Sequence, residues 1–186
     1  MKRSSEESKE TILAAARERF ATEGYDRATI RAIAAEANID PAMVMRYFGN
    51  KEQLFAAAAE FDLRLPDLAD VERERVGAVL AAHFLDRWEG DEALMILLRG
   101  GVTKEDVAER MRGIFANQLA PIVNRLSSDP SEAPTRAALV STQILGLALC
   151  RYVLRVPPVV AMSREEVIAW FGPTLQYYLT GEAPVR

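Results

Sequence analysis

One stretch of the chain decides the fold: residues 29–48 read TIRAIAAEANIDPAMVMRYF. Thr29 is a residue type that caps helix N-termini, and the apolar residues after it recur at helical spacing. Asn38 adopts the left-handed conformation of a tight turn at low cost, and Asp40 followed by Pro41 is a typical start for a second helix. The stretch therefore predicts a helix-turn-helix, whose second helix enters the major groove of DNA by its N-terminal end.

The residues on either side complete a small helical domain. Ser4 and Glu7 have the spacing of a capping box, which predicts a first helix from there to Gly24. Asn50 and Gln53 repeat the pattern and predict a fourth helix that ends near residue 62. The expected core residues of this domain are Phe20, Ile33, Val44, Phe48, Leu54 and Phe55.

Three cations and a tyrosine lie where DNA phosphates would pass. Arg31 is near the start of the first helix of the motif, and Arg46, Tyr47 and Lys51 lie on or just after the second. The tyrosine and two of these cations, together with two helix N-termini, would form a phosphate clamp. Residues 27–51 hold four cations and two carboxylates, a local charge of +2 that leaves −6 for the rest of the chain. A buried, hydrogen-bonded tyrosine and two helices that only pack together would give the same pattern.

Composition indicates an ordinary globular protein. Of the 186 residues, 49% are apolar and 27% are charged, which excludes a disordered chain. The net charge of −4 argues against non-specific coating of nucleic acid, although the local field decides binding. No apolar run is long enough to span a membrane, and the charged N-terminus lacks the apolar core of a signal peptide. We therefore expect a cytoplasmic protein.

The sequence offers few residues for catalysis. Cys150 is the only cysteine, so no intramolecular disulfide can form. His83 is the only histidine, and its apolar surroundings favour a packed, hydrogen-bonded side chain. Neither a nucleophile elbow nor a glycine-rich phosphate loop is present. We predict no catalytic residue, no metal site and no cofactor.

Longer apolar helices follow Pro66. They are expected at residues 67–88, 92–99, 135–154 and 164–179, with interruptions at Gly100-Gly101 and Pro121 and an end at Pro157-Pro158. Ser163 and Glu166 form another capping-box pattern. No alternating pattern typical of strands is found. The prediction is an all-α protein, with a three-helix helix-turn-helix domain at residues 1–50 and a larger helical domain at residues 51–186.

The last two predicted helices are apolar on more than one face. The positions concerned are Leu139, Gln143, Gly146, Leu147 and Cys150 in one helix, and Val167, Trp170, Phe171 and Tyr178 in the other. In a protein of this size, a second copy is the economical way to bury the second face. We expect a homodimer through the helices near 135–154 and 164–179, and therefore a roughly palindromic site on double-stranded DNA.

The N-terminal third resembles the DNA-binding domain of the TetR family of regulators. The residues that carry this resemblance are ILAAA at 12–16, Phe20, Gly24-Tyr25, TIRAIA at 29–34, YFGNKE at 47–52 and Leu54-Phe55. The motif is specific because it sets several residue types at fixed offsets over some forty positions. The resemblance implies that the larger domain binds a ligand and dimerises, and that the protein is a transcriptional regulator, chiefly a repressor.

The resemblance also implies roles for particular residues. Thr29 and Arg31 match DNA-contacting positions, Tyr47 and Lys51 match phosphate contacts, and the base-facing positions are Pro41, Ala42 and Met43. Family members often carry polar or small residues at Pro41 and Met43, and a tyrosine at Met45. Apolar contact to a thymine methyl is what Ala42 and Met43 can offer, so base hydrogen bonding would depend on Arg31 and Arg46 or on DNA shape.

A ligand site is expected among large apolar side chains of the second domain. The candidates are Phe61, Phe84, Trp88, Met111, Phe115, Leu119 and Tyr152, and packing alone would also explain them. The expected ligand is small and mostly apolar, with Arg151 or Arg155 as a polar anchor. Two other functions stay open: a helical protein-interaction module without specific DNA binding, and an all-helical enzyme that uses His83.

Overall fold

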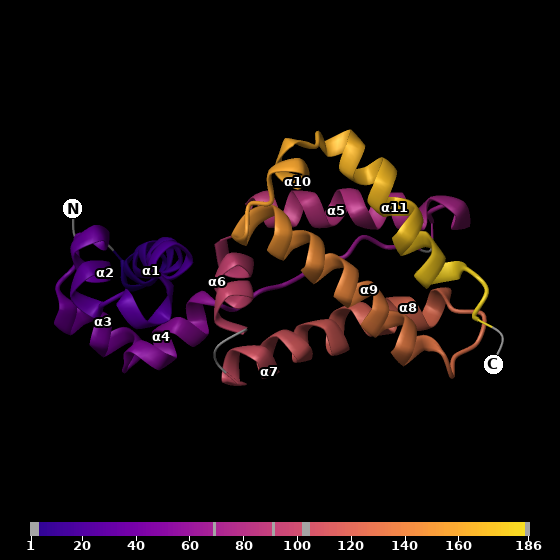
Figure 1. The fold of residues 1–186 in the computed structure, drawn as a ribbon. Coiled ribbons are helices and arrows are strands. Elements are labelled where there is room, and N and C mark those ends of the chain that lie inside the picture. The colour runs from indigo at the N-terminus through magenta and orange to yellow at the C-terminus, as the bar shows by residue number, and fades with distance from the viewer. Residues whose placement is uncertain (1–3, 69, 91, 102–104, 185–186) are drawn as a thin grey trace. The chain divides into compact units, whose positions relative to one another are not determined.

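The computed structural model describes residues 4–68, 70–90, 92–101 and 105–184. Every regular element in these ranges is a helix (Figure 1), so the predicted all-α fold is confirmed. The chain divides into two compact units, Met1–Phe61 with Asp91–Ala108, and Asp62–Gly90 with Glu109–Arg186. A functional boundary after residue 50 stays a prediction. Within the described ranges, no helix combines the length and apolar character that crossing a membrane requires.

The first unit is built around its longest helix. Its elements are α1 (Ser5–Arg27), α2 (Ile30–Ala37), α3 (Pro41–Phe48), α4 (Lys51–Ala58) and α6 (Glu92–Gly101). α1 packs against α2, α4 and α6, and buried Phe20 and Phe55 meet edge to face with ring centroids 4.9 Å apart. Val44 is fully buried, whereas Phe48, at the end of α3, is only half-buried. The prediction that Phe48 is a core residue is wrong, because α3 ends there.

α1 begins as the sequence predicts and is interrupted at the residue where its end was predicted. Both halves of the capping box form: the Glu7 amide donates to Ser4 Oγ at 3.1 Å, and the Ser4 amide donates to the Glu7 carboxylate at 2.7 Å. Gly24 takes the predicted left-handed φ of 77° and leaves helical geometry there, so it divides α1 into two helical parts at a kink. One further turn follows, to Arg27.

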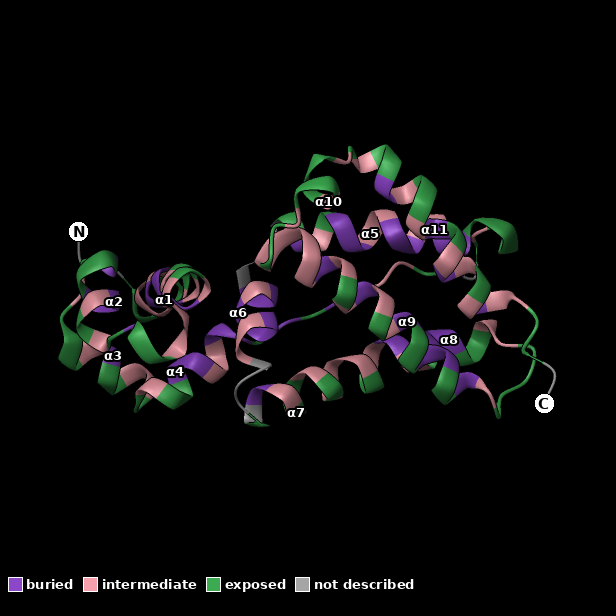
Figure 2. Cartoon of the chain, in the orientation of Figure 1, coloured by how far each residue is buried: buried purple, intermediate pink, exposed green. Residues whose placement is uncertain are grey.

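The second unit is a bundle of longer helices. Its elements are α5 (Val76–Gly90), α7 (Glu105–Ile114, which begins in the first unit), α8 (Ala120–Leu126), α9 (Ala133–Ala148), α10 (Pro157–Ala161), α11 (Arg164–Thr180), a 3₁₀ turn (Arg73–Arg75) and two π-helical turns (Phe115–Leu119 and Leu149–Val153). α5 packs along α11, and α9 packs against α8 and α11. Buried residues line the facing sides of α5 and α9 (Figure 2).

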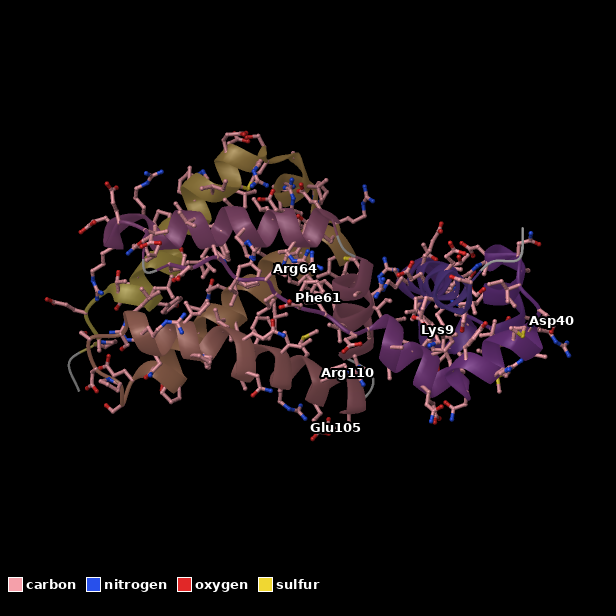
Figure 3. The ribbon with its side chains drawn as sticks, turned by 180° about the vertical axis from the view of Figure 1, so that it is seen from behind. Lys9, Asp40, Phe61, Arg64, Glu105 and Arg110 are labelled. Atoms are coloured by element: carbon pink, nitrogen blue, oxygen red, sulfur yellow. The ribbon has the colours of Figure 1, made fainter. Side chains whose placement is uncertain are left out.

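The prediction of a helix over residues 67–88 is wrong for the first third of that range. The described residues from 60 to 72 are not helical, and α5 begins only at Val76. Figure 3 shows Phe61 and Arg64 on this segment. Side chains from distant parts of the chain bind the backbone of this segment at Leu63. The Leu63 amide donates to Gln118 Oε1 at 2.7 Å, and the Leu63 carbonyl accepts from His83 Nε2 at 2.8 Å. A pattern of local residues carries no signal for such distant partners.

The helix predicted over residues 135–154 is also divided. The α-helical hydrogen bonds stop at Ala148, and the π-helical turn Leu149–Val153 follows. The proline pair begins α10, with Pro157 in its first turn, where the missing N–H costs nothing. The capping box at Ser163 and Glu166 is confirmed as the start of α11, which continues through Pro173.

Candidate nucleic-acid interface

The turn between α2 and α3 is built by short polar side chains. Thr29 Oγ1 accepts from the Ala32 amide at 3.1 Å, and Asp40 Oδ1 accepts from the Ala42 amide at 2.7 Å. Asn38 occupies the left-handed region with φ 52°. These contacts confirm the predicted helix-turn-helix, and Figure 3 shows Asp40 at the beginning of α3. The start of α3 is thus set by a cap between residues that are neighbours in the sequence.

α3 presents one exposed face. Pro41, Ala42, Met45 and Arg46 are exposed, while Val44 is buried (Figure 2). These exposed residues lie one turn apart, as the 3.6-residue period requires. Of the predicted base-facing residues, Met43 is half-buried. Met45, which is 43% exposed, was not among the predicted site residues, although its i+4 spacing from Pro41 was a signal for it.

The predicted phosphate-contacting residues have different surroundings. Thr29 and Arg31 are exposed at the start of α2, and Tyr47 is half-buried near the end of α3. The Lys51 ammonium lies 4.4 Å from the centroid of the Tyr25 ring and donates to the Asp26 carbonyl at 3.3 Å. Lys51 therefore ties the start of α4 to the end of α1, a link that the sequence pattern did not indicate.

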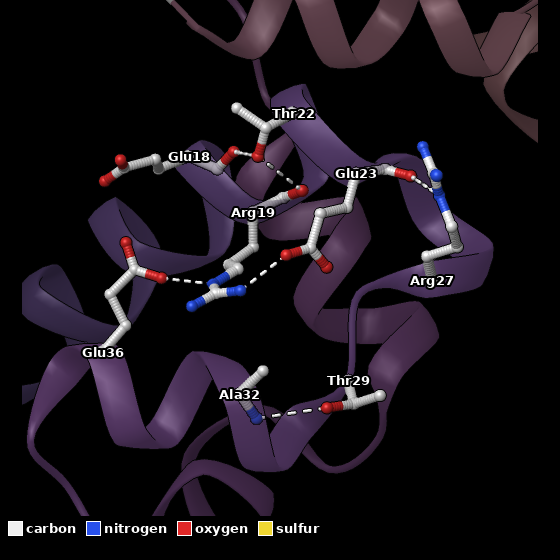
Figure 4. A network of polar contacts seen from close by, with 8 residues as sticks. All are labelled: Glu18, Arg19, Thr22, Glu23, Arg27, Thr29, Ala32 and Glu36. Atoms are coloured by element: carbon white, nitrogen blue, oxygen red, sulfur yellow. Dashed lines mark hydrogen bonds and ion pairs between the residues drawn. The ribbon is translucent and has the colours of Figure 1, made fainter.

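Polar contacts also join α1 to α2. Arg19 binds the carboxylates of Glu36, on α2, and Glu23, on its own helix (Figure 4). The Glu36 and Glu23 hydrogen bonds raise the pKa of Arg19 above its ordinary value. The orientation of α2, and with it the turn before α3, is held by this network as well as by the buried faces of the helices.

Three of the seven predicted ligand residues line one described cavity. Phe84, Trp88 and Tyr152 line a small cavity of about 10 Å³ among α5, α9 and the following π-helical turn. Met111, Phe115 and Leu119 lie along α7 and its π-helical continuation and are absent from this lining. Phe61 is buried and belongs to the first compact unit. The structure therefore brings three of the seven together.

Polar groups lie within this aromatic cluster. Trp88 is 5% exposed, and its indole N–H has no acceptor among the described residues. Its ring stacks on Tyr152 with a centroid separation of 6.1 Å. Burial, followed by the nearby Glu89 carboxylate, raises the pKa of Tyr152 to about 12. An unpaired buried donor is uncommon in folded proteins, so Trp88 marks a place where an acceptor could bind.

The two arginines proposed as anchors are placed differently. Arg151 donates to the carbonyls of Val159 and Met162, at 2.6 and 3.1 Å, and so holds α10 against the preceding turn. Arg155 is exposed and has a left-handed φ of 52°. His83 donates to a backbone carbonyl, as the packed interpretation predicts.

α11 exposes large aromatic side chains. Trp170 is 77% exposed and Tyr177 is 51% exposed, and their separation of seven residues puts them on one face of the helix. Leu139 on α9 is exposed as well. A hollow of about 580 Å³ is lined by the start of α9 and the end of α11, including Leu139 and Tyr177.

Comparison with protein families matches both parts of the chain. The family model of bacterial regulatory proteins, tetR family, matches residues 12–58. The model for a tetracyclin repressor-like C-terminal domain matches residues 74–179, more than half of the chain. A comparison with curated proteins gives no match.

Solved structures with this fold come from several bacteria. A TetR-family regulator from Streptomyces coelicolor A3 is 26% identical, with a TM-score of 0.64, over 96% of this chain and 98% of that one. A transcriptional regulator from Rhodococcus sp. Rha1 is 22% identical, with a TM-score of 0.71, over 95% and 99%. A TetR-like regulator from Rhodococcus sp. RHA1 is 17% identical, with a TM-score of 0.70, over 98% and 100%. The last two show the fold alone.

These matches agree with the geometry of α2 and α3. The family models span the helix-turn-helix and most of the second unit, and the similar structures extend over almost the whole chain. The chain belongs to the TetR family of bacterial transcriptional regulators and is a DNA-binding regulator.

Proposed function

We propose that the protein is a homodimeric repressor that binds a palindromic operator in the bacterial cytoplasm and leaves it when a small, mostly apolar molecule binds. It acts by binding alone, without a catalytic step. The observation that carries the proposal is the exposed start of α3, where Pro41, Ala42, Met45 and Arg46 face solvent between the cations of α2 and α4.

The residues of this candidate interface divide into two roles on DNA. Arg31, Tyr47 and Lys51 would bind phosphates and set the register of the domain on the duplex, with the Thr29 end of α2 beside them. Arg46 would hydrogen-bond to a guanine edge or to a phosphate. The remaining positions, Pro41, Ala42, Met43 and Met45, would make apolar contacts with thymine methyl groups.

A second copy of the chain is proposed to pack on the exposed face of α9 and α11. Trp170 and Tyr177 supply large apolar surfaces that water otherwise covers. Aromatic side chains of this kind are enriched where subunits meet. The resulting two-fold axis would place two α3 helices on successive major grooves, about 34–36 Å apart or somewhat more.

The ligand is proposed to enter the cluster of Phe84, Trp88 and Tyr152. The present cavity of about 10 Å³ holds no more than one water molecule, so a ligand would have to open it. A ligand that binds better when the α3 helices are splayed would release the operator, with α4 acting as a lever. A coupling free energy of about 1–3 kcal/mol corresponds to roughly a 5- to 150-fold loss of affinity.

The test is a selection of genomic fragments from the source organism with purified protein, followed by fluorescence anisotropy of the enriched fragments. We expect a shared palindrome that binds at nanomolar concentrations and weakens as salt rises. Arg46→Ala should weaken binding, whereas Arg125→Ala, an exposed cation on α8, is the matched control and should not.

The apolar start of α3 favours one other candidate, a protein-interaction module. That function predicts no enrichment of any sequence and no steep salt dependence of DNA affinity. Either result would contradict the repressor. A ligand that binds tightly to the protein but leaves operator affinity unchanged would contradict the release mechanism alone.

A further inference from the structure

Lys51, a proposed phosphate contact, is held by two groups at the end of α1. Its ammonium lies 4.4 Å from the centroid of the Tyr25 ring, within the range of a cation–π interaction. The same ammonium donates to the Asp26 carbonyl at 3.3 Å. Both partners follow the kink at Gly24, and Lys51 is the first residue of α4.

The Tyr25 ring is itself held by aromatic neighbours. It meets Phe55 edge to face, with centroids 5.0 Å apart and an interplanar angle of 84°. It also stacks with Phe20 at 6.1 Å and 17°. Phe55 lies one turn after Lys51 on α4, so the ring is placed by the same helix whose first side chain it contacts.

The left-handed φ of Gly24 explains how the chain brings Tyr25 to this place. With φ at 77°, Gly24 turns the chain out of the helix at the residue before Tyr25. An L-residue adopts that conformation at a cost. The Tyr25 ring and the Asp26 carbonyl, both just after this turn, thus contact one ammonium group.

A lysine ammonium has three N–H donors on a flexible stem. Binding a phosphate ordinarily restricts that stem, which costs conformational entropy. A side chain that is already ordered in the free protein loses less on binding. Lys51 is half-exposed, and its ammonium is held by the Tyr25 ring and the Asp26 carbonyl.

We propose that Tyr25 is a positioning residue for DNA binding: its ring and the Asp26 carbonyl hold the Lys51 ammonium in the orientation that binds an operator phosphate. The proposal rests on the phosphate contact assigned to Lys51 under the proposed function. If Tyr25 only fills the core, its loss would weaken DNA binding whether or not Lys51 is present.

A double-mutant cycle separates these two roles. Tyr25→Leu, Lys51→Met and the double variant are titrated with a selected operator fragment at several salt concentrations. Because the dimer carries two copies of Lys51, Lys51→Met should reduce the slope of log K against log salt by about 1.8, the value for two phosphate contacts. Tyr25→Leu should lower affinity by about 5- to 30-fold in the wild-type background, as expected when a dimer loses two exposed cation–π pairs. In the Lys51→Met background it should have no effect.

Two variants that keep the aromatic ring distinguish the loss of the cation–π interaction from a folding defect. Tyr25→Phe keeps the ring and should bind the operator as the wild type does. Tyr25→trifluorophenylalanine keeps the shape but weakens the attraction of the ring for a cation. It should lower affinity as Tyr25→Leu does, with an unchanged thermal unfolding midpoint.

Three different results would each contradict one step of the proposal. An equal loss from Tyr25→Leu with and without Lys51 would show that Tyr25 acts on the fold. Full affinity in the trifluorophenylalanine variant would show that the ring's attraction for the cation is irrelevant. If Lys51→Met leaves the salt slope unchanged while Arg46→Ala still weakens binding, the phosphate contact of Lys51 is wrong, although the DNA-binding function stands.

Discussion

The two compact units start their helices in different ways. In the first unit, side chains of Ser4, Thr29, Asp40 and Asn50 cap α1 to α4 in turn. In the second unit, α9 and α10 begin without a side-chain cap, and α8 continues from the π-helical turn before it; α11 is capped by Ser163. The DNA-binding helices are thus specified locally, whereas the later helices depend more on packing between distant residues.

The largest expected effect concerns packing in the second unit. At Gly77 on α5, an added Cβ would lie 2.4 Å from the Gly172 carbonyl oxygen and 2.5 Å from the Gln176 amide nitrogen, both backbone atoms of α11. Gly77→Ala should therefore cost about 3 kcal/mol of unfolding free energy, the upper part of the range for overpacking. Denaturant unfolding measures the cost.

The control for Gly77 is Gly113→Ala on α7, where the nearest atom to the new Cβ is Asn117 Nδ2 at 4.0 Å. This variant should be about 0.5–1 kcal/mol more stable than the wild type, because glycine is unfavourable within a helix. Hydrogen exchange in Gly77→Ala should rise in α5 and α11 and stay unchanged in α2 to α4. Equal loss of protection in α2 to α4 would contradict the local specification of the first unit.

A cap in the first unit should have the next largest effect. Asp40→Ala removes the acceptor for the Ala42 amide at the start of an eight-residue helix. It should cost about 1 kcal/mol of stability and should also weaken operator binding, because α3 carries the proposed base contacts. Ser163→Ala, which removes the cap of α11, should cost a similar amount without changing operator affinity. Equal operator affinities for the two variants would contradict the assigned role of α3.

These caps also show which parts of the structure the sequence could predict. Thr29, Asp40, Asn50 and Ser163 each act on an amide two or three residues away, so a local pattern identifies them. The helix-turn-helix and its exposed Arg31 and Arg46 follow from the same local pattern together with helical periodicity.

What the sequence could not predict depends on distant partners. In the non-helical segment before α5, the backbone amide and carbonyl of Leu63 form hydrogen bonds with Gln118 and His83, which are far away in the chain. The contact of Lys51 with Tyr25 crosses from α4 to α1. Burial of Phe48 was expected from its residue type, but burial depends on which helices cover the end of α3, and residue type does not supply that information.

A smaller effect is expected at high pH in the second unit. The pKa of Tyr152 is raised to about 12, whereas a tyrosine in an unfolded chain titrates near 10. The unfolded chain therefore loses this proton first, so stability is unaffected below about pH 10 and falls as pH rises from about 10 to 12. Tyr152 is half-buried, so solvent screening makes the loss modest.

Difference absorbance of phenolate measures this titration in wild type and in Tyr152→Phe. The wild type should have one tyrosine that ionises near pH 12 and that the variant lacks, and the variant should lose less stability above pH 10. A tyrosine signal that is the same in the wild type and in Tyr152→Phe near pH 12 would refute the assignment.

The smallest effect on folding is expected at Trp170. Because the side chain is 77% exposed, Trp170→Glu should change the folding stability of one subunit by no more than about 0.5 kcal/mol. It should nevertheless convert a dimer to monomers in analytical ultracentrifugation. Ala161→Glu, on an exposed position of α10, should leave the dimer intact. A Trp170→Glu protein that stays dimeric would remove this face from the proposed interface.

The central claim is that the exposed start of α3 and the cations beside it bind DNA as a specific operator. The most direct measurement is the affinity of the wild type and of Arg31→Ala for a selected fragment between 50 and 200 mM salt. We predict nanomolar binding at the lower salt and a steep fall in affinity at the higher salt. The slope should be about 1.8 smaller in the variant, because the dimer loses two phosphate contacts. Equal affinity for selected and random DNA, with the same slope in both proteins, would contradict the claim.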